Sequence, residues 1–217
     1  MIITKQKDKK TILDYLKNDK NIFITGCAQC ATVCKTGGAD QVEEIKTLLE
    51  KHGKVVTGTV VIDPPCHLVK SKKMYQQNKN EIQKSDAILA LACGDGIQSI
   101  MEGAKGKKIH PGLDTLFLGE VLSGGAFEQK CLLCAECVLD ETGGFCPITL
   151  CPKGLLNGPC GGAKNKKCEV DKTIDCVWIK IYERLKDLGQ LQEIKRIKPP
   201  RDNSKRINPR KHTLEKK

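Results

Sequence analysis

Cysteine is the residue type whose number and spacing point to chemistry in this sequence. The chain has 13 cysteines among 217 residues, and eight of them lie between Cys131 and Cys176. The first three, Cys131, Cys134 and Cys137, form a C-x2-C-x2-C run. Thiolates at this spacing can reach three corners of a cubane cluster from one tight loop. The run therefore predicts a 4Fe-4S cluster whose fourth thiolate comes from further along the chain.

Five later cysteines in this stretch can supply that fourth ligand and a second metal site. They are Cys146, Cys151, Cys160, Cys168 and Cys176. The first two precede a proline, which removes an amide donor and stiffens the backbone beside the ligand, as in ferredoxin-type sites. Bacterial ferredoxins exchange one ligand between cysteine runs, so the sequence leaves the partition open. The second site can hold either an iron–sulfur cluster or zinc.

Another group of cysteines lies near the start of the chain. Cys27, Cys30 and Cys34 form a C-x2-C-x3-C run directly after the apolar residues 21–25. We interpret them as three ligands of a further 4Fe-4S cluster. The x3 spacing allows a zinc knuckle but does not favour it.

Cys66 and Cys93 are the candidates for the fourth ligand of this N-terminal site. Each follows an apolar run that is typical of a strand, residues 55–63 and residues 87–92. Ligands of parallel sheets sit at the C-terminal ends of the strands, so Cys27, Cys66 and Cys93 should converge on one edge. The alternative for each of the last two is a buried apolar cysteine under a loop.

Of these two residues we favour Cys93. Gly94 and Gly96 let backbone amides approach a cluster, and a helix that begins near residue 97 would stabilise negative charge at its N-terminus. Cys66 is then a neighbouring thiol, although the two roles can be exchanged.

Hydrophobic periodicity predicts the elements that position these residues. We expect strands at 21–25, 55–63, 87–92 and 114–118, and helices at 11–19, 41–52, 68–80, from about 97, and 177–191. Asp40 and Glu43 resemble a capping box for the helix at 41–52. The alternation of strand and helix predicts an α/β domain with a small, three-layered parallel sheet over residues 1–125.

The remainder of the chain has a different composition. Residues 126–194 are rich in Cys, Gly and Pro, so we expect a metal-organised, irregular domain. It ends in an amphipathic helix whose stripe of Trp178, Ile181, Leu185 and Leu188 should pack on a core, with a docking face as the alternative. Residues 195–217 carry ten Lys or Arg against two acids and account for most of the net charge of +11. We expect a basic, extended tail that is solvated or wraps a partner.

Composition also limits the compartment and the class of protein. No positively charged start leads into an apolar run, so we expect no signal peptide, no membrane span and a cytoplasmic location. Disulfides rarely persist in that reducing compartment, and thirteen cysteines therefore indicate metal or redox chemistry. The chain has no glycine-rich phosphate loop and only 4% aromatic residues, which argues against nucleotide or nucleic-acid binding.

The amino-acid sequences of several segments resemble a known family. The segments are GCAQCATVCKTGG, DAILALACGDGIQ, CVLDETGGFCPITLCPKGLLNGPCGG and CEVDKTIDCVWIKIYERLK. They look like the small iron–sulfur subunit of two-subunit methylenetetrahydrofolate reductases, which also occurs as the cysteine-rich C-terminal domain of some larger reductases. The resemblance covers roughly residues 20–190 and leaves out the start of the chain and the basic tail.

This resemblance implies an accessory subunit of an oxidoreductase that transfers electrons through two or more 4Fe-4S clusters. Its partner would be the flavin-bearing catalytic subunit, which binds the folate and performs hydride transfer, and further electron-donor proteins would supply the electrons. The flavin is expected on that partner. The alternative is a zinc-stabilised structural or assembly subunit without a redox role.

Overall fold

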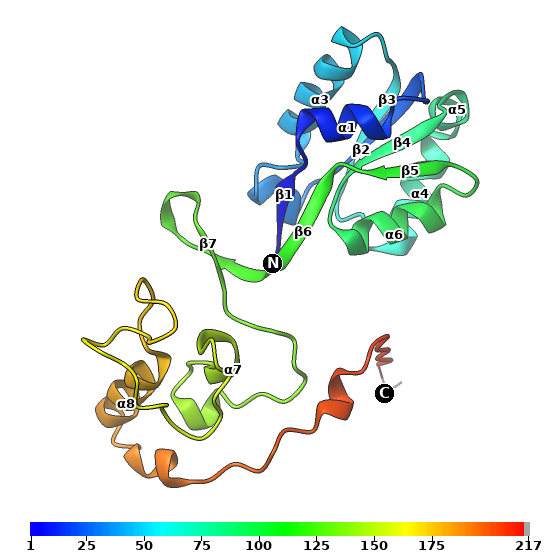
Figure 1. Cartoon of the computed structure of the whole chain (residues 1–217). Coiled ribbons are helices and arrows are strands. Elements are labelled where there is room, and N and C mark those ends of the chain that lie inside the picture. Colours follow the sequence, from blue (N-terminus) through cyan, green and yellow to red (C-terminus); the bar gives the residue numbers. More distant parts are fainter. Residues whose placement is uncertain (215–217) are drawn as a thin grey trace. The chain divides into compact units, whose positions relative to one another are not determined.

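The computed structural model describes residues 1–214, which fall into two compact units. The first unit is Met1–Phe127, and the second begins at Glu128 (Figure 1). Within the described residues no helix is both long and apolar enough to cross a lipid bilayer.

A four-stranded parallel sheet forms the centre of the first unit. Its strands, in the order β3-β2-β4-β5, are β3 (Val55–Ile62), β2 (Asn21–Cys27), β4 (Ala87–Leu91) and β5 (Lys108–Pro111). Every residue of β4 is buried, as are six of the seven residues of β2. Such continuous apolar runs are typical of parallel strands that are covered on both faces. The predicted α/β class and the parallel sheet are confirmed.

Helices cover both faces of this sheet. They are α1 (Lys9–Tyr15), α2 (Cys30–Val33), α3 (Ala39–Lys51), α4 (Leu68–Gln77), α5 (Lys79–Lys84) and α6 (Gly94–Gly103). Figure 1 shows α1 and α3 on one side of the sheet and α4 and α6 on the other. The strand order explains this placement, because right-handed crossovers that leave β2 and β4 in opposite directions put their helices on opposite faces.

Two predictions about these helices are wrong in detail. The capping box of α3 is not Asp40 with Glu43, because the helix begins at Ala39 and the Gly38 N–H donates to Gln41 Oε1 at 3.2 Å. The helix predicted at 68–80 breaks at Asn78, and it is not wholly exposed. Its residue Tyr75 is buried, and the Tyr75 hydroxyl lies 2.7 Å from that of Thr25.

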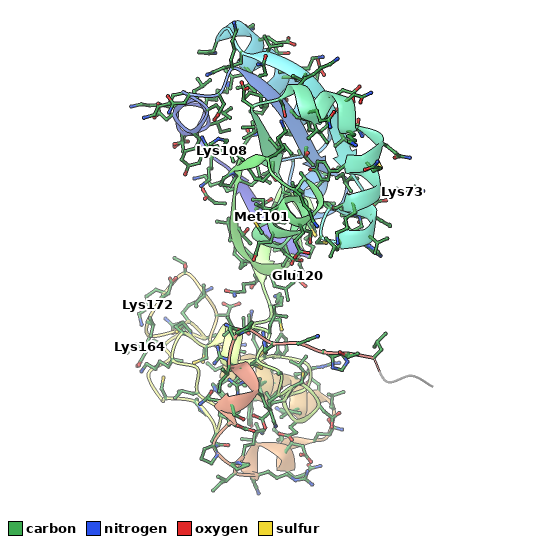
Figure 2. The ribbon with its side chains drawn as sticks, turned by 90° about the vertical axis from the view of Figure 1, so that its right-hand side faces the viewer. Lys73, Met101, Lys108, Glu120, Lys164 and Lys172 are labelled. Atoms are coloured by element: carbon green, nitrogen blue, oxygen red, sulfur yellow. The ribbon has the colours of Figure 1, made fainter. Side chains whose placement is uncertain are left out.

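Most outward positions on these helices are polar, although Val69 of α4 and Met101 of α6 are exposed. On α4, for example, Lys73 is exposed and points away from the unit (Figure 2). The buried and exposed positions of α4 therefore alternate as expected for an amphipathic helix that covers a sheet.

The strand predicted at 114–118 exists but belongs to another sheet. It lies in β6 (Leu113–Val121), which pairs antiparallel with β1 (Ile2–Gln6) in a sheet of order β1-β6-β7. Gly112 marks the exchange of partners, because its N–H donates to the Ala90 carbonyl at 2.8 Å and its carbonyl accepts the Lys7 N–H at 2.9 Å. The fourth parallel strand is instead β5, which the sequence did not reveal. A 3-10 helix, η1 (Ser123–Gly125), and β7 (Phe127–Gln129) follow.

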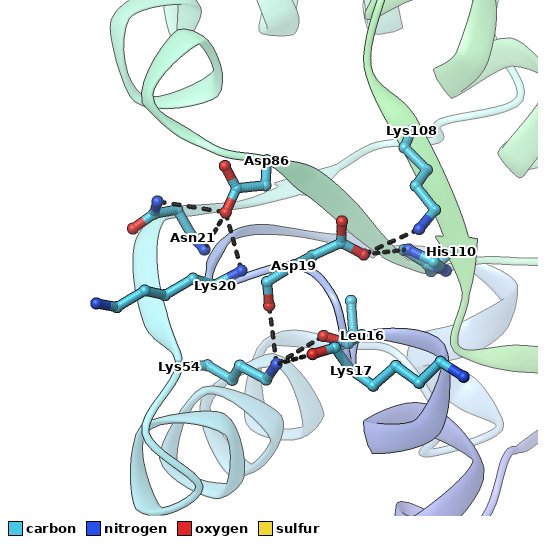
Figure 3. A network of polar contacts seen from close by, with 9 residues as sticks. All are labelled: Leu16, Lys17, Asp19, Lys20, Asn21, Lys54, Asp86, Lys108 and His110. Carbon is cyan, nitrogen blue, oxygen red and sulfur yellow. Dashed lines mark hydrogen bonds and ion pairs between the residues drawn. The ribbon is translucent and has the colours of Figure 1, made fainter.

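A polar network fixes the loop between α1 and β2 (Figure 3). Lys54 Nζ donates to the carbonyl oxygens of Leu16 and Asp19 at 2.6 and 2.9 Å. At the next turn, the Asp86 carboxylate accepts the backbone N–H groups of Lys20 and Asn21 at 2.9 and 2.7 Å. The network therefore ties the end of α1 to the starts of β2 and β4, at the edge of the sheet opposite the strand ends that carry the cysteines.

Asp19 links this loop to β5. Its carboxylate oxygen Oδ2 lies 2.9 Å from His110 Nε2 and 3.1 Å from Lys108 Nζ. Burial alone would raise the pKa of Asp19, but hydrogen bonds from Lys108 and His110 outweigh it and lower the pKa below its usual value. The ionised form of Asp19 is thus the form that stabilises the fold.

The second unit has little regular structure and one small core. Its helices are α7 (Pro147–Leu150) and α8 (Val177–Asp187), with 3-10 turns η2 (Asp140–Thr142), η3 (Leu191–Lys195) and η4 (Asn203–Arg206). Val177, Trp178, Ile181 and Leu185 of α8 form the buried core. Trp178 Nε1 donates to the Leu155 carbonyl at 3.1 Å, which satisfies its buried N–H.

The predicted stripe of α8 is confirmed as core packing, with one exception. Leu188 is 44% exposed, because the helix ends at Asp187 and Gly189 adopts a left-handed conformation with φ of +69°. A glycine in that conformation is a common helix stop, so the helix is shorter than predicted.

The basic tail is extended, but it also contacts its own unit. The Asp202 N–H donates to Glu136 at 3.1 Å, and Lys205 pairs with the same carboxylate at 3.2 Å. Arg210 donates to the Leu133 carbonyl at 2.8 Å. The described part of the tail therefore touches the loop of the C-x2-C-x2-C run. Residues 215–217 of the predicted tail lie outside the described residues.

Replacing Asp19 with asparagine should lower the free energy of unfolding by about 1–3 kcal/mol at pH 7, since charge-assisted hydrogen bonds are lost. Because the folded state lowers the pKa of Asp19, this contribution is present above the unfolded pKa of about 3.9 and is lost as the pH falls through the folded value. Urea unfolding of both proteins should show a difference that shrinks on acidification. Asp14→Asn, at an exposed site on α1, is the control and should change stability by less than about 0.5 kcal/mol.

Replacing Ile181 with alanine should destabilise the second unit by about 2–5 kcal/mol, because it leaves a cavity against α8. The exposed Ile197, replaced in the same way, should have little effect. Denaturant unfolding followed by Trp178 fluorescence measures both. Equal effects of the two substitutions would contradict a core built on α8.

Candidate functional site

The carboxyl edge of the parallel sheet gathers cysteines from three strands. In the register of the sheet, Cys27 is opposite Ile62, the last residue of β3, and Gly26 is opposite Leu91, the last residue of β4. The loops that carry Cys66 and Cys93 therefore start at the level of Cys27. The chain also leaves β2 and β4 in opposite directions, and this topological switch point is where open α/β sheets bind their ligands.

The pKa values of two thiols at this edge are shifted by burial and by nearby groups. Burial raises the pKa of the Cys27 thiol; backbone hydrogen bonds from Ala31 and Gln29 oppose this, and the nearby Cys30 and Cys93 raise it further. Partial desolvation also raises the pKa of Cys66, and the charges of Asp95, Cys93 and Cys27 act in the same direction. Cys27, Cys30, Cys66 and Cys93, which lie on the loops at this edge, are called here the sheet-edge thiols.

Cys34 is close to β1. It ends α2, and its Sγ lies 3.9 Å from the Ile2 carbonyl oxygen on β1. The structure brings the loops of Cys66 and Cys93 to the sheet edge that carries Cys27. The predicted set of Cys27, Cys30 and Cys34 with one of Cys66 and Cys93 stays a prediction.

The two glycines after Cys93 have roles different from those expected. Helix α6 begins at Gly94, not near residue 97, and the Gly94 N–H donates to Thr115 Oγ1 at 2.8 Å. At Gly96 an added Cβ would lie 3.1 Å from Ala92 Cβ and 3.2 Å from Pro65 Cγ. Gly96 therefore lets the loop of Cys66 pack against the start of α6.

Two neighbours of the sheet-edge thiols were not identified from the sequence as part of the site. Asp95, in the first turn of α6, is the largest charged influence on Cys66. Gln29 donates to Asp63, which links the loop after β2 with the end of β3. The sequence signal that could have identified Asp95 as a neighbour was its position directly after Cys93-Gly94.

His67, next to Cys66, has a structural role. It caps α4 by accepting the Lys70 N–H at 3.4 Å.

The C-x2-C-x2-C run of the second unit forms an irregular loop. Leu133 and Ala135 both have positive φ, 53° and 61°, so the chain reverses direction between successive cysteines. The Leu133 N–H donates to Cys131 Sγ at 3.3 Å, and the Cys134 thiol lies 3.4 Å from the Glu136 carbonyl. Non-glycine residues in this conformation are uncommon and concentrate at functional sites.

Cys146 follows this loop after a tight turn. The Gly144 N–H donates to the Leu139 carbonyl at 2.8 Å, and the Thr142 hydroxyl donates to Val138 at 2.9 Å. The chain therefore folds back between Cys137 and Cys146. Cys146 caps α7, and its Sγ lies 3.4 Å from Thr149 Oγ1.

The other four cysteines line one cavity beside α8. They are Cys151, Cys160, Cys168 and Cys176. All thirteen cysteines of the chain are free thiols in the structure. Among residues 1–214, no three His, Cys, Asp or Glu side chains stand at the close spacing of ligands on a single metal ion. The donors present are nevertheless of the kind that iron–sulfur clusters require, because each cluster iron takes a separate thiolate.

Comparison with known proteins gives one match. Residues 110–204 match a family described as "Methylene-tetrahydrofolate reductase C terminal". The matched segment runs from β5 to η4 and contains all eight cysteines of the second unit, but it is less than half of the chain. The comparisons with curated proteins and with solved structures gave no match. The second unit is therefore similar to the C-terminal family of methylenetetrahydrofolate reductase.

Proposed function

We propose that this chain is an iron–sulfur electron-transfer subunit that works beside a flavin-bearing methylenetetrahydrofolate reductase subunit. The observation that carries the proposal is the convergence of the sheet-edge thiols from three strand ends, at the position where α/β sheets bind ligands. The family match of residues 110–204 supports the choice of enzyme. A 4Fe-4S cluster, when bound, accepts and passes on one electron at a time.

The residues around the sheet-edge thiols suit an anionic cluster. Backbone groups of Gln29 and Ala31 lower the pKa of the Cys27 thiol against the effect of burial, and hydrogen bonds to cluster sulfurs are one determinant of reduction potential. Cys93 is the N-cap of α6, so the positive end of this ten-residue helix dipole lies beside the site. Cys27 is only 6% exposed, which limits access of water. The protein thus provides binding, orientation and exclusion of solvent.

In the second unit, Cys131, Cys134 and Cys137 are proposed to bind another cluster. The exposure of Cys131 and Cys137 leaves that site near the surface, where a partner can approach. Electron transfer falls steeply with distance, so an exposed cluster is the suitable exit toward a flavin on another subunit. No glycine-rich dinucleotide loop is present in the sequence, and the flavin is therefore placed on the partner.

The ligands of the sheet-edge site can be tested by iron and sulfide analysis after anaerobic purification. The unaltered chain should be brown and contain about eight or more irons. Cys66→Ser and Cys93→Ser should each remove about four irons, whereas Cys34→Ser, next to Ile2, should remove none. Loss of iron in the Cys34 variant alone would reverse the ligand choice. Colourless protein with zinc only would favour the structural or assembly subunit instead.

Electron transfer itself can be followed in the complex with the flavin subunit. On addition of an external reductant the visible absorption of the clusters should bleach, and it should return when methylenetetrahydrofolate is supplied as oxidant. Cys93→Ser should slow flavin reduction, while the flavin subunit alone should still bind folate. Folate turnover without any change in cluster absorption would contradict the proposed role.

A further inference from the structure

The cavity beside α8 contains four of the five cysteines whose partition the sequence left open. Cys151, Cys160, Cys168 and Cys176 line it, whereas Cys146 does not. The remaining walls include Leu150, Leu155, Val177 and Trp178. Its volume is about 20 Å³, room for a water-sized guest.

A short hairpin places two of the four thiols on one face. Lys167 and Asp175 form an antiparallel bridge, the Cys168 N–H donates to Ile174 at 3.0 Å, and the Cys176 N–H donates to Lys166 at 2.8 Å. Residues next to a bridged pair share the opposite face of the ladder, so Cys168 and Cys176 project to the same side.

The loops of this hairpin lie away from the cavity. Lys164 and Lys172 are exposed and occupy the outer margin of the second unit (Figure 2). The hairpin therefore presents its cysteines inward, toward α8, and its lysines to solvent.

The loops that carry the other two thiols are tied to this hairpin. Lys153, two residues after Cys151, forms an ion pair with Glu169, which directly follows Cys168. Gly162 has the Glu169 side chain where a Cβ would be, so a larger residue there would displace the Glu169 carboxylate. The Gly162 N–H donates to Cys160 Sγ at 3.4 Å. Glu169 thus contacts both the loop that carries Cys151 and the loop that carries Cys160.

We propose that Cys151, Cys160, Cys168 and Cys176 together bind one thiophilic metal centre, and that Cys146 instead completes the C-x2-C-x2-C group. A metal centre held by four thiolates has no position left for a substrate, which is the pattern of a centre that organises the fold. Cys176 is the N-cap of α8, so this centre fixes the start of the helix that forms the core. The proposal goes beyond electron transfer and holds whether or not that function is correct.

Paired substitutions test which cysteines share a centre. In the full chain, Cys151→Ser and Cys168→Ser should each remove one centre, and the double variant should lose no more than either single one. Cys146→Ser combined with Cys151→Ser should lose two centres. Metal analysis distinguishes the two kinds of centre. Loss of an iron–sulfur cluster removes about four irons with sulfide, whereas loss of a zinc site removes one zinc. A single zinc would require the four sulfurs to move closer together, and a cluster would require the cavity to widen.

The partition is overturned if Cys146→Ser adds nothing to the loss in Cys151→Ser, or if Cys151→Ser and Cys168→Ser remove different centres. A second measurement uses the unaltered chain and does not depend on the folding of variants. During slow metal release by a chelator, alkylation followed by mass spectrometry should label the four thiols in step with one another. Cys146 should be labelled in step with Cys131, Cys134 and Cys137. Labelling of Cys146 together with Cys176 would refute the grouping.

Discussion

The parallel register of β2 with β3 and β4 is the constraint on which the first unit depends. Because Cys27 faces the last residue of β3 and Gly26 faces the last residue of β4, three loops start at one level. Apolar strands buried on both faces hold this register, and the Asp19 and Lys54 contacts secure the opposite edge. A one-residue slip would reverse every side chain of a strand, so the cysteine-bearing loops keep their positions as long as the core does.

The sequence was informative where a segment's own pattern decided its structure. The runs at 21–25 and 87–92 were apolar enough to identify β2 and β4, and the stripe of Trp178, Ile181 and Leu185 identified α8. Prediction from the sequence failed where contacts with a distant segment determined the structure. The segment 114–118 is a strand in either sheet, and only the hydrogen bonds of Gly112 to Ala90 and Lys7 determine that it pairs with β1. Likewise, Gln41 displaced Glu43 as the capping side chain because the preceding Gly38 was already extended.

The same distinction applies to the candidate sites. Convergence of Cys66 and Cys93 on Cys27 follows from the direction of parallel strands, and sequence reasoning could reach it. The contact of Cys34 with Ile2 could not be predicted, because it depends on β1, a strand of mixed polarity whose partner lies more than 100 residues away. In the second unit the grouping of four thiols depends on Glu169, whose contacts with Lys153 and Gly162 join residues distant in sequence. Spacing alone carries no such information.

Gly96 shows how a position without a side chain can control the approach of two cysteine-bearing loops. Its missing side chain is what allows Pro65, next to Cys66, to approach the turn that follows Cys93. One methyl group there would press on both loops at distances tighter than ordinary van der Waals contact. Variation among relatives should therefore be restricted at this glycine as strongly as at the cysteines, and a survey of ligands alone would overlook a residue that sets the width of the site.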